Sequence, residues 1–204
     1  MRAVFVLLKT EMSIKILFGL GNSEAVYAAT RHNVGALLLK SVADKCGAEF
    51  SHNKFCNAQI AKVRFGASAV VLAFCCGYMN NSGIGVGRVL SFYKMASSEA
   101  AVIYDDISLE LGRVKITLGG SSGGHNGVND IIGRVGNDFV RLRMGVGSKP
   151  FKEMDLADHV LGKMTAYEME KIASFDICGC VETLVLGGLA RAQNVYNRAE
   201  ADRG

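Results

Sequence analysis

The chain has 204 residues, of which 50% are hydrophobic and 21% charged, with a formal net charge of +4. This length suits one ordinary domain with a substantial core, and the composition excludes the disordered and fibrous classes of protein. The 6 cysteines lack the C-x-x-C spacing of zinc knuckles. We interpret them as buried thiols in a reducing compartment and expect no metal site.

The first clear strand begins close to residue 13, so we interpret residues 1–12 as an N-terminal extension of a domain at residues 13–204. The apolar run of the extension is shorter than the core of a signal peptide, and no small-residue cleavage site follows it. The longest apolar run, around residues 67–79, falls short of the roughly 18 residues that identify a membrane span. We therefore expect a cytoplasmic protein without a membrane segment.

Strands and helices alternate along the chain without a linker or a repeat. Apolar runs and period-two alternation predict strands at residues 14–20, 55–65, 67–74, 101–104, 113–118 and 139–146. Helical spacing predicts helices at residues 33–46, 82–94 and 128–135. Thr165 and Glu168 form a capping box before a long helical stretch, which Gly187 and Gly188 interrupt before residues 189–198. The order predicts a single α/β domain with a central mixed, twisted β-sheet flanked by helices.

Polar residues follow several of the predicted strands. Asn22, Asn80 and Asp105 each come just after a strand, and His125 and Asn126 lie in the glycine-rich loop after another. Because α/β proteins place their chemistry at strand ends, this distribution indicates an active site.

The triplet R-H-N at the entrance of the first helix supplies His32 as a candidate general base, since a free imidazole titrates near pH 6.5. We expect Asp105, at a neighbouring strand end, to orient this imidazole. The amides of Asn22, Asn80 and Asn126 offer uncharged donors and acceptors, which suit a peptide backbone and a developing oxyanion. No cysteine or lysine adjoins His32, so water is the simplest nucleophile and a hydrolase is the simplest enzyme.

Basic residues cluster in one segment. Residues 113–152 carry seven lysines and arginines against two aspartates, an excess larger than the net charge of the whole chain. A clustered excess of this kind suits a phosphate-rich partner.

Two glycine motifs do not meet the requirements of nucleotide-binding loops. Gly19-x-Gly21 follows a strand, but Glu24 occupies the position of the third glycine, where a carboxylate would repel a pyrophosphate. The loop at residues 119–124 is followed by His125 and Asn126 instead of the Lys-Ser/Thr pair of a phosphate-binding loop. Neither motif predicts a nucleotide site.

The same glycine loop also matches the G-x-S-x-G pattern of a serine nucleophile, at Ser121 and at Ser122. Asp155 or Asp158, with His159, follow in the order of a catalytic triad. A serine esterase that uses the loop at residues 119–123 is therefore an alternative, although glycine- and serine-rich loops produce the pattern by chance.

The successive motifs resemble the signatures of bacterial peptidyl-tRNA hydrolases in the order of that family: G-L-G-N-S-E-A-V-Y-A-A-T-R-H-N-V-G, Y-M-N-N-S-G, Y-D-D-I-S-L-E-L-G, G-G-S-S-G-G-H-N-G and R-L-R-M-G-V-G. The resemblance runs from about residue 13 to residue 198. It implies an esterase that cleaves the bond between a peptide and the terminal ribose of tRNA and so recycles prematurely released peptidyl-tRNA. It also implies no cofactor, peptidyl-tRNA as the partner and a cytoplasmic monomer.

The resemblance assigns a role to each motif residue. His32 would activate water and Asp105 would orient it, while Asn22, Asn80 and Asn126 would hold the peptide backbone and stabilise the tetrahedral intermediate. Arg143 would contact a tRNA phosphate. The remaining substrate-binding residues would shape the cleft: Tyr27, Tyr78, Met79 and His125. A non-catalytic RNA-binding protein of the same fold is the alternative from another functional class.

The chain departs from the family pattern at several positions. Ser23 replaces the usual proline, which predicts a looser turn, and Cys76-Gly77-Tyr78 changes the cleft wall. Thr117 stands where a basic residue is common before the glycine loop. Lys115 lies two residues earlier on the same strand face, so we expect it to replace the missing cation and to bind phosphate together with Arg143.

Overall fold

The computed structural model describes residues 13–198, and the predicted extension at residues 1–12 lies outside them. Seven strands form one sheet in the order β2-β3-β4-β1-β5-β7-β6. β1 pairs in parallel with β4 and β5, and β5 with β7, whereas β2-β3-β4 and β6-β7 pair antiparallel. The strands are β1 Ile16–Gly19, β2 Ser51–Asn53, β3 Ala58–Phe65, β4 Ser68–Cys75, β5 Ala100–Asp106, β6 Val114–Leu118 and β7 Val140–Gly145. The predicted single α/β domain with a mixed sheet is confirmed.

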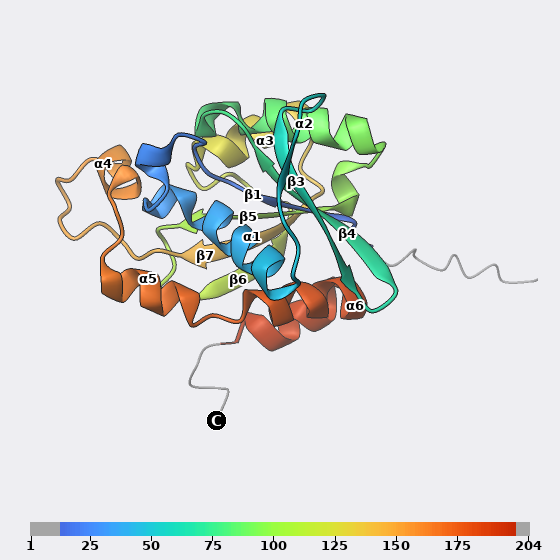
Figure 1. The fold of residues 1–204 in the computed structure, drawn as a ribbon. Helices are drawn as coiled ribbons and strands as arrows, with labels where there is room; N and C mark the ends of the chain where they lie inside the picture. Colours follow the sequence, from blue (N-terminus) through green and yellow to red (C-terminus); the bar gives the residue numbers. More distant parts are fainter. Residues whose placement is uncertain (1–12, 199–204) are drawn as a thin grey trace, which may run out of the picture.

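Helices cover both faces of this sheet (Figure 1). Alternation along β1 gives the two faces separate cores: Leu17 packs with α1 and α6, while Ile16 and Phe18 pack with α2 and α3. The helices are α1 Val34–Lys45, α2 Ser82–Tyr93, α3 Asn126–Val135, α4 Leu156–Leu161, α5 Ala166–Ala173 and α6 Ile177–Tyr196, with short 3-10 turns η1 Ala25–Tyr27, η2 Arg31–Asn33, η3 Met79–Asn81 and η4 Ser97–Glu99.

Two short elements were absent from the sequence prediction. β2 is the polar tripeptide S-H-N, which forms a strand because it pairs with the edge of β3 and not because of an apolar pattern. The Asn53 side chain accepts from the N–H groups of Phe55 and Cys56, so the next strand begins at Ala58 instead of residue 55. α4 has six residues, too few for helical periodicity to stand out, and Asp155 caps it.

By length and composition alone, the helical segment Ala166–Tyr196 is long and apolar enough to cross a membrane. α5 and α6 are separate helices, and Gly188, at φ 76°, interrupts α6 where the sequence predicted a break. Each continuous piece is therefore shorter than the about 20 residues that span a bilayer. Ile177, Cys180 and Leu184 of α6 are buried in the core on the α1 face of the sheet.

Candidate active site

A cavity of about 1100 Å³ opens beside the carboxyl ends of β1 and β5, between the glycine loop and α4. Its position agrees with the rule that open α/β sheets bind ligands at strand ends. All predicted catalytic and substrate-binding side chains, and one of the two predicted phosphate contacts, line it: Asn22, Tyr27, His32, Tyr78, Met79, Asn80, Asp105, His125, Asn126 and Arg143. Lys115 is not among the residues that line this cavity.

His32 lies in η2, immediately before α1, and glycines bring this segment close to the sheet. A Cβ on Gly35 would lie 2.2 Å from the carbonyl oxygen of Ile103 on β5, and a Cβ on Gly19 would lie 2.4 Å from the carbonyl oxygen of Gly35. Only glycines at these positions let the first turn of α1 rest on β1 and β5. This packing places His32 beside Asp105, the sixth residue of β5.

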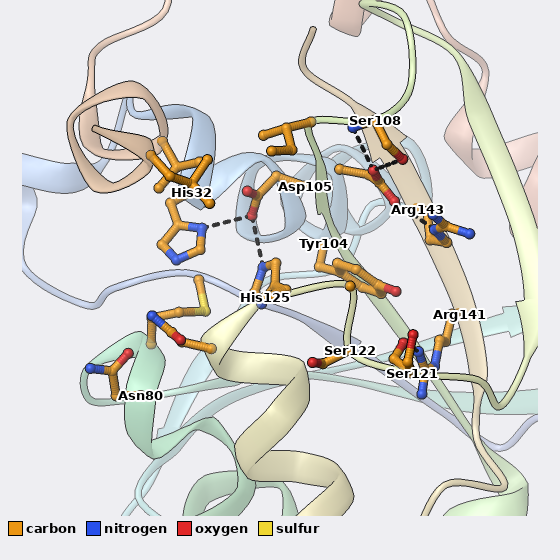
Figure 2. A pocket seen from close by; sticks show the side chains of 18 of the residues that line it. His32, Asn80, Tyr104, Asp105, Ser108, Ser121, Ser122, His125, Arg141 and Arg143 are labelled. Atoms are coloured by element: carbon orange, nitrogen blue, oxygen red, sulfur yellow. Dashed lines mark hydrogen bonds and ion pairs between the residues drawn. The ribbon is translucent and has the colours of Figure 1, made fainter. Parts of the chain in front are cut away.

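Asp105 lies between two histidines and accepts from both (Figure 2). Its Oδ1 is 2.9 Å from Nδ1 of His32 and 3.0 Å from Nε2 of His125. The Val128 N–H donates to Nδ1 of His125 at 3.2 Å, so Nδ1 is an acceptor and the ring donates to Asp105 from Nε2. His32 likewise donates from Nδ1 to the carboxylate. Its Nε2, on the other side of the ring, therefore carries the lone pair that a general base requires.

The carboxyl group of Asp105 is ionised in this environment. Burial by itself raises the pKa of Asp105, whose exposed fraction is 4%. The charges and hydrogen bonds of His125 and His32 outweigh burial and hold the pKa well below its usual range. Asp105 is thus a fixed negative charge that orients His32 and stabilises an imidazolium.

His125 contributes more to this arrangement than the sequence predicted. The prediction placed His125 among the residues that shape the cleft, and it does line the cavity. Both ring nitrogens are also engaged, one with Asp105 and one with the first turn of α3. Tyr104 packs against the ring edge-on, with centroids 5.0 Å apart. His125 therefore fixes the position of Asp105 relative to α3.

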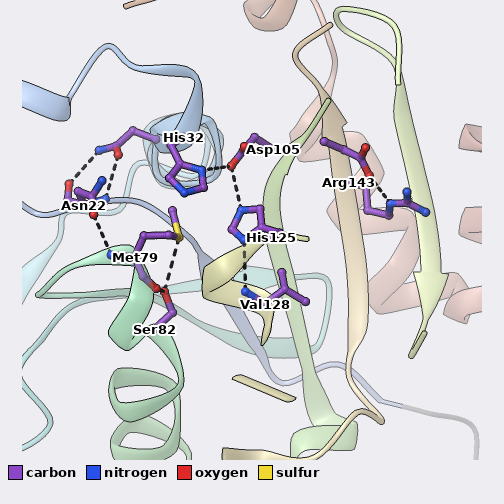
Figure 3. A network of polar contacts seen from close by, with 10 residues as sticks. Asn22, His32, Met79, Ser82, Asp105, His125, Val128 and Arg143 are labelled. Atoms are coloured by element: carbon purple, nitrogen blue, oxygen red, sulfur yellow. Dashed lines mark hydrogen bonds and ion pairs between the residues drawn. The ribbon is translucent and has the colours of Figure 1, made fainter. Parts of the chain in front are cut away.

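The side-chain amide of Asn22 is oriented by backbone contacts (Figure 3). The Met79 N–H donates to Oδ1 of Asn22 at 2.7 Å, which leaves the NH₂ group as the part of the side chain that can donate to a ligand. Asn33 holds the backbone of Asn22 from the other side, accepting from its N–H and donating to its carbonyl, each at 2.9 Å. Asn80 and Asn126 are exposed residues on the cavity wall.

Sequence reasoning assigned no role to two residues of the R-H-N triplet. Asn33 holds the Asn22 loop, as described above. Arg31 donates to Glu168 on α5 at 2.7 and 3.0 Å and to the carbonyl oxygens of His159 and Gly162. It therefore ties the histidine segment to α4 and α5. The sequence signal for both roles was the presence of three adjacent polar residues before a helix, of which only His32 had an assigned function.

At the rim of the cavity, residues that depart from the family pattern form hydrogen bonds across the cleft wall. The Ser23 N–H donates to the Gly77 carbonyl at 3.0 Å, and its Oγ accepts from the Gly77 N–H at 3.1 Å. A proline at position 23 would lack both groups, so the turn gains two hydrogen bonds where we had predicted loosening. The Tyr78 hydroxyl donates to Glu24, and this contact raises the pKa of Tyr78.

Arg143 and Lys115 lie directly opposite each other on β7 and β6. The Arg143 Nε donates to Oδ2 of Asp106 at 2.6 Å, so its terminal nitrogens extend beyond this ion pair. Thr117 pairs with Arg141 one step along the same ladder. Cross-strand neighbours in this register share a sheet face. The register is therefore compatible with the predicted joint contact of Lys115 and Arg143 with a phosphate.

The basic segment offers fewer free charges than its composition suggested. Arg141 is buried, with an exposed fraction of 2%, and donates to the Ser121 and Gly120 carbonyls of the glycine loop at 2.5 and 2.6 Å. Arg134 pairs with Asp130 along α3 at 2.8 Å. The net charge of the segment therefore overstates its exposed charge, because Arg141 is buried under the glycine loop.

The groups of the serine-esterase alternative do not come together. Ser121, Ser122 and Asp155 all line the cavity, but the Asp155 carboxylate accepts from the Ala157 N–H and caps α4. His159 is buried, and its Nε2 is 3.1 Å from the Gly147 carbonyl. The described residues therefore contain no hydrogen-bonded pair of a loop serine and His159. The G-x-S-x-G match is a consequence of composition in a loop that Arg141 supports.

One group of side chains in the described part of the chain has the chemistry to bind a metal ion. Candidate ligand atoms of His32, Asp105 and His125 lie within 4.8 Å of one another. In the structure these atoms are joined by hydrogen bonds to a shared carboxylate oxygen. An ion there would have to replace both N–H protons, so the observed geometry is that of a hydrogen-bonded base and not of a coordination sphere.

A family model described as peptidyl-tRNA hydrolase matches residues 16–203. The chain belongs to the peptidyl-tRNA hydrolase family. It is 40% identical over 188 residues to a peptidyl-tRNA hydrolase of Lachnoclostridium phytofermentans, covering 91% of this chain and 97% of that protein. A peptidyl-tRNA hydrolase of Anaeromyxobacter dehalogenans is 41% identical over 191 residues, with the same coverage.

The fold agrees with solved structures of this family. The crystal structure of peptidyl-tRNA hydrolase from Acinetobacter baumannii superposes with a TM-score of 0.85 at 32% identity, covering 92% of this chain and 96% of that one. The match spans nearly the whole of both chains. The family resemblance predicted from the motifs is therefore confirmed, while the individual residue roles, the monomeric state and the cytoplasmic location stay predictions.

Proposed function

We propose that this peptidyl-tRNA hydrolase family member cleaves the ester between a peptide and the terminal ribose of tRNA. The observation that carries the proposal is the 2.9 Å contact of His32 Nδ1 with the buried Asp105, whose lowered pKa makes it the acceptor of an Nδ1–H. Nε2 is thereby free to accept a proton from water in the cavity. The cavity, of about 1100 Å³, is large enough for the end of a nucleic acid and a short peptide.

The first step is attack by water on the ester carbonyl. His32 Nε2 removes the proton as the water oxygen bonds to carbon, and Asp105 stabilises the resulting imidazolium. The negative charge then resides on the former carbonyl oxygen. The Asn22 NH₂, oriented by Met79, is the best positioned donor for this oxyanion, because its geometry is set before the substrate binds.

The second step is collapse of the tetrahedral intermediate. The ribose oxygen leaves, and the imidazolium of His32 returns the proton to it, so that the products are an intact tRNA and a peptide carboxylic acid, which ionises by releasing its proton to solvent. Asn80 and Asn126, on the cavity wall, would pair with the amide groups of the peptide. Arg143 and Lys115 would hold a backbone phosphate and align the tRNA end with His32.

Uncharged amides also predict which substrates are cleaved. A free aminoacyl-tRNA carries a cationic α-amine, which neutral amides compensate poorly once it is desolvated. An N-blocked aminoacyl-tRNA presents an amide instead, which Asn22, Asn80 and Asn126 can pair with. We therefore expect a strong preference for the N-blocked form.

The test compares release of the acyl group from N-acetyl-aminoacyl-tRNA and from the same tRNA with a free amine. Rapid release from the blocked substrate and slow release from the free one supports the proposal. Equal rates would contradict our account of the cleft. Tight tRNA binding without any release would instead favour the alternative of a non-catalytic RNA-binding protein.

A further inference from the structure

Two of the cysteines meet on the sheet face that α1 and α6 cover. Cys46 and Cys178 are 132 residues apart in sequence, yet their Sγ atoms lie 4.0 Å apart. Both side chains are partly exposed, and both are free thiols. They therefore combine proximity with access for a small reagent, which the buried Cys56 and Cys180 lack.

The backbone on both sides of this pair is fixed. Cys46 follows the last residue of α1, and its N–H donates to the carbonyls of Val42 and Ala43 at 3.1 Å. Cys178 lies in the first turn of α6, which Asp176 caps. Lys45 and Asp176, next to the two cysteines, form an ion pair at 2.9 Å. The two helix ends thus hold the two sulfurs close together.

A disulfide between these residues requires the sulfur atoms to approach from 4.0 Å to about 2.05 Å. Rotation about the Cα–Cβ bonds with a small shift of α6 supplies a movement of this size. We propose that Cys46 and Cys178 form a reversible oxidation site that covalently joins the end of α1 to the start of α6. This proposal is independent of the catalytic function.

The reaction balances with a hydroperoxide as the oxidant. One thiolate attacks the peroxide, becomes a sulfenic acid and releases water or an alcohol. The second thiol displaces the sulfenic hydroxyl as water and forms the S–S bond. The protein loses two hydrogen atoms, and the peroxide is reduced by two electrons. A dithiol such as dithiothreitol reverses the change by thiol–disulfide exchange.

The environment distinguishes the two sulfurs. Burial and the neighbouring Cys46 raise the pKa of Cys178 to about 11, so Cys178 is a protonated thiol at neutral pH. Because the thiolate is the reactive form, we assign Cys178 as the resolving thiol, and its partner Cys46 attacks the peroxide first. The raised pKa also makes disulfide formation faster as the pH increases above neutrality.

The disulfide is expected to stabilise the fold without changing the active site. It would close a loop of more than a hundred residues, and constraints of this size raise Tm by roughly 5–15 °C in a protein of this length. Cys46 is separated from His32 by the full length of α1, roughly 18 Å. Turnover of the oxidised and reduced proteins is therefore expected to agree.

The experiment treats the full-length protein with hydrogen peroxide at pH 7 and pH 9, blocks remaining thiols and maps non-reduced peptides by mass spectrometry. The expected result is a peptide pair joined through Cys46 and Cys178, formed faster at pH 9. Tm should rise on oxidation and return after dithiothreitol. Cys46→Ser and Cys178→Ser should each abolish the rise, whereas Cys76→Ser, a partly exposed cysteine elsewhere, should retain it.

Other outcomes overturn the proposal. A linkage through Cys75, Cys76 or another cysteine would place the oxidation elsewhere, and sulfonic acid at Cys46 without a linked peptide would show that Cys178 does not resolve it. A Cys46–Cys178 linkage that leaves Tm unchanged would remove the stabilising role. Serine is close to cysteine in size, so each variant is expected to fold. Circular dichroism of each variant before oxidation checks this.

Discussion

The two ends of the cavity are built on different principles. At one end His32, Asp105 and His125 are nearly inaccessible and joined by hydrogen bonds of 2.9 and 3.0 Å. At the other end Arg143, partly exposed, holds Asp106 through one nitrogen, and Lys115 lies opposite it on the neighbouring strand. One end holds buried groups in fixed positions, and the other presents partly exposed charge to solvent.

This difference predicts that substitutions at the two ends change different kinetic parameters. A buried base acts only in the transition state, so damage there lowers kcat. Exposed cations attract phosphates over a distance that salt screens, so damage there raises KM and alters the salt dependence. The comparison fails if substitutions at the two ends affect the same parameter.

The largest effect is expected from His32→Ala. Loss of a general base should lower kcat by about 10²–10⁴-fold, while tRNA binding measured by filter retention should change little. His52→Ala is the matched control, because His52 is exposed on β2 and, among the described residues, its side chain is hydrogen-bonded only to Asn57. Near-normal turnover of His32→Ala would remove this residue from the mechanism.

Asp105→Asn should lower kcat by roughly 10–10³-fold, less than His32→Ala, because the base is retained. Both histidines contact the same oxygen, Oδ1, so an amide oxygen in its place can still accept from both, but the neutral amide no longer stabilises the imidazolium. The control is Asp106→Asn, the adjacent residue, which contacts Arg143 and should change KM instead. Equal kcat losses in the two variants would contradict the division between the ends.

The same aspartate should affect acid stability. Its folded-state pKa is lowered, so its contribution to stability is present above the unfolded pKa of about 3.9 and is lost as the pH falls towards the folded value. Between pH 5 and pH 3, the urea concentration at the midpoint of unfolding should therefore fall further for the native protein than for Asp105→Asn. If the midpoints of both proteins fell equally, Asp105 would not be the source of the lost stability in acid.

At the exposed end, Lys115→Ala should raise KM for full-length peptidyl-tRNA several-fold with kcat nearly unchanged. The slope of log KM against log salt should fall by about one phosphate contact. A minimal substrate with only the terminal nucleotide should be insensitive. Lys62→Ala, an exposed lysine on β3, serves as the control, and an unchanged slope in Lys115→Ala would leave Arg143 as the phosphate contact without its partner.

The smallest effect is expected from Ser121→Ala and Ser122→Ala, each within about twofold of native turnover. Both serines line the cavity, but in the described residues no hydrogen bond joins either hydroxyl to a histidine side chain. Steady-state kinetics of the two variants suffices. Loss of activity in either would revive the serine-nucleophile alternative.

The location of the site could be predicted from sequence because it depends on strand order. Asn22 and Asn80 follow β1 and β4, Asp105 lies at the end of β5, and parallel strands bring their carboxyl ends to one edge of a sheet. The rule needs no knowledge of side-chain packing. It therefore placed these residues in one cavity even though the exact strand ends were off by a few positions.

What the sequence could not predict are contacts that depend on tertiary approach. Asn33 binds the backbone of Asn22 only because η2 folds back over β1. Arg141 and Arg143 lie two residues apart on one strand, and periodicity treats them alike. One is buried under loop carbonyls and the other is partly exposed, because only the first lies beneath the glycine loop.

The strand order also dictates when the active site can exist during folding. Ile16 on β1 pairs with Val71 on β4 and with Ala100 on β5, so the central strand waits for partners made much later. Non-local parallel pairing of this kind is slow to form. A nascent chain that has emerged only through β4 possesses His32 but no Asp105, and catalytic competence is therefore expected to arrive late and together with the completed sheet.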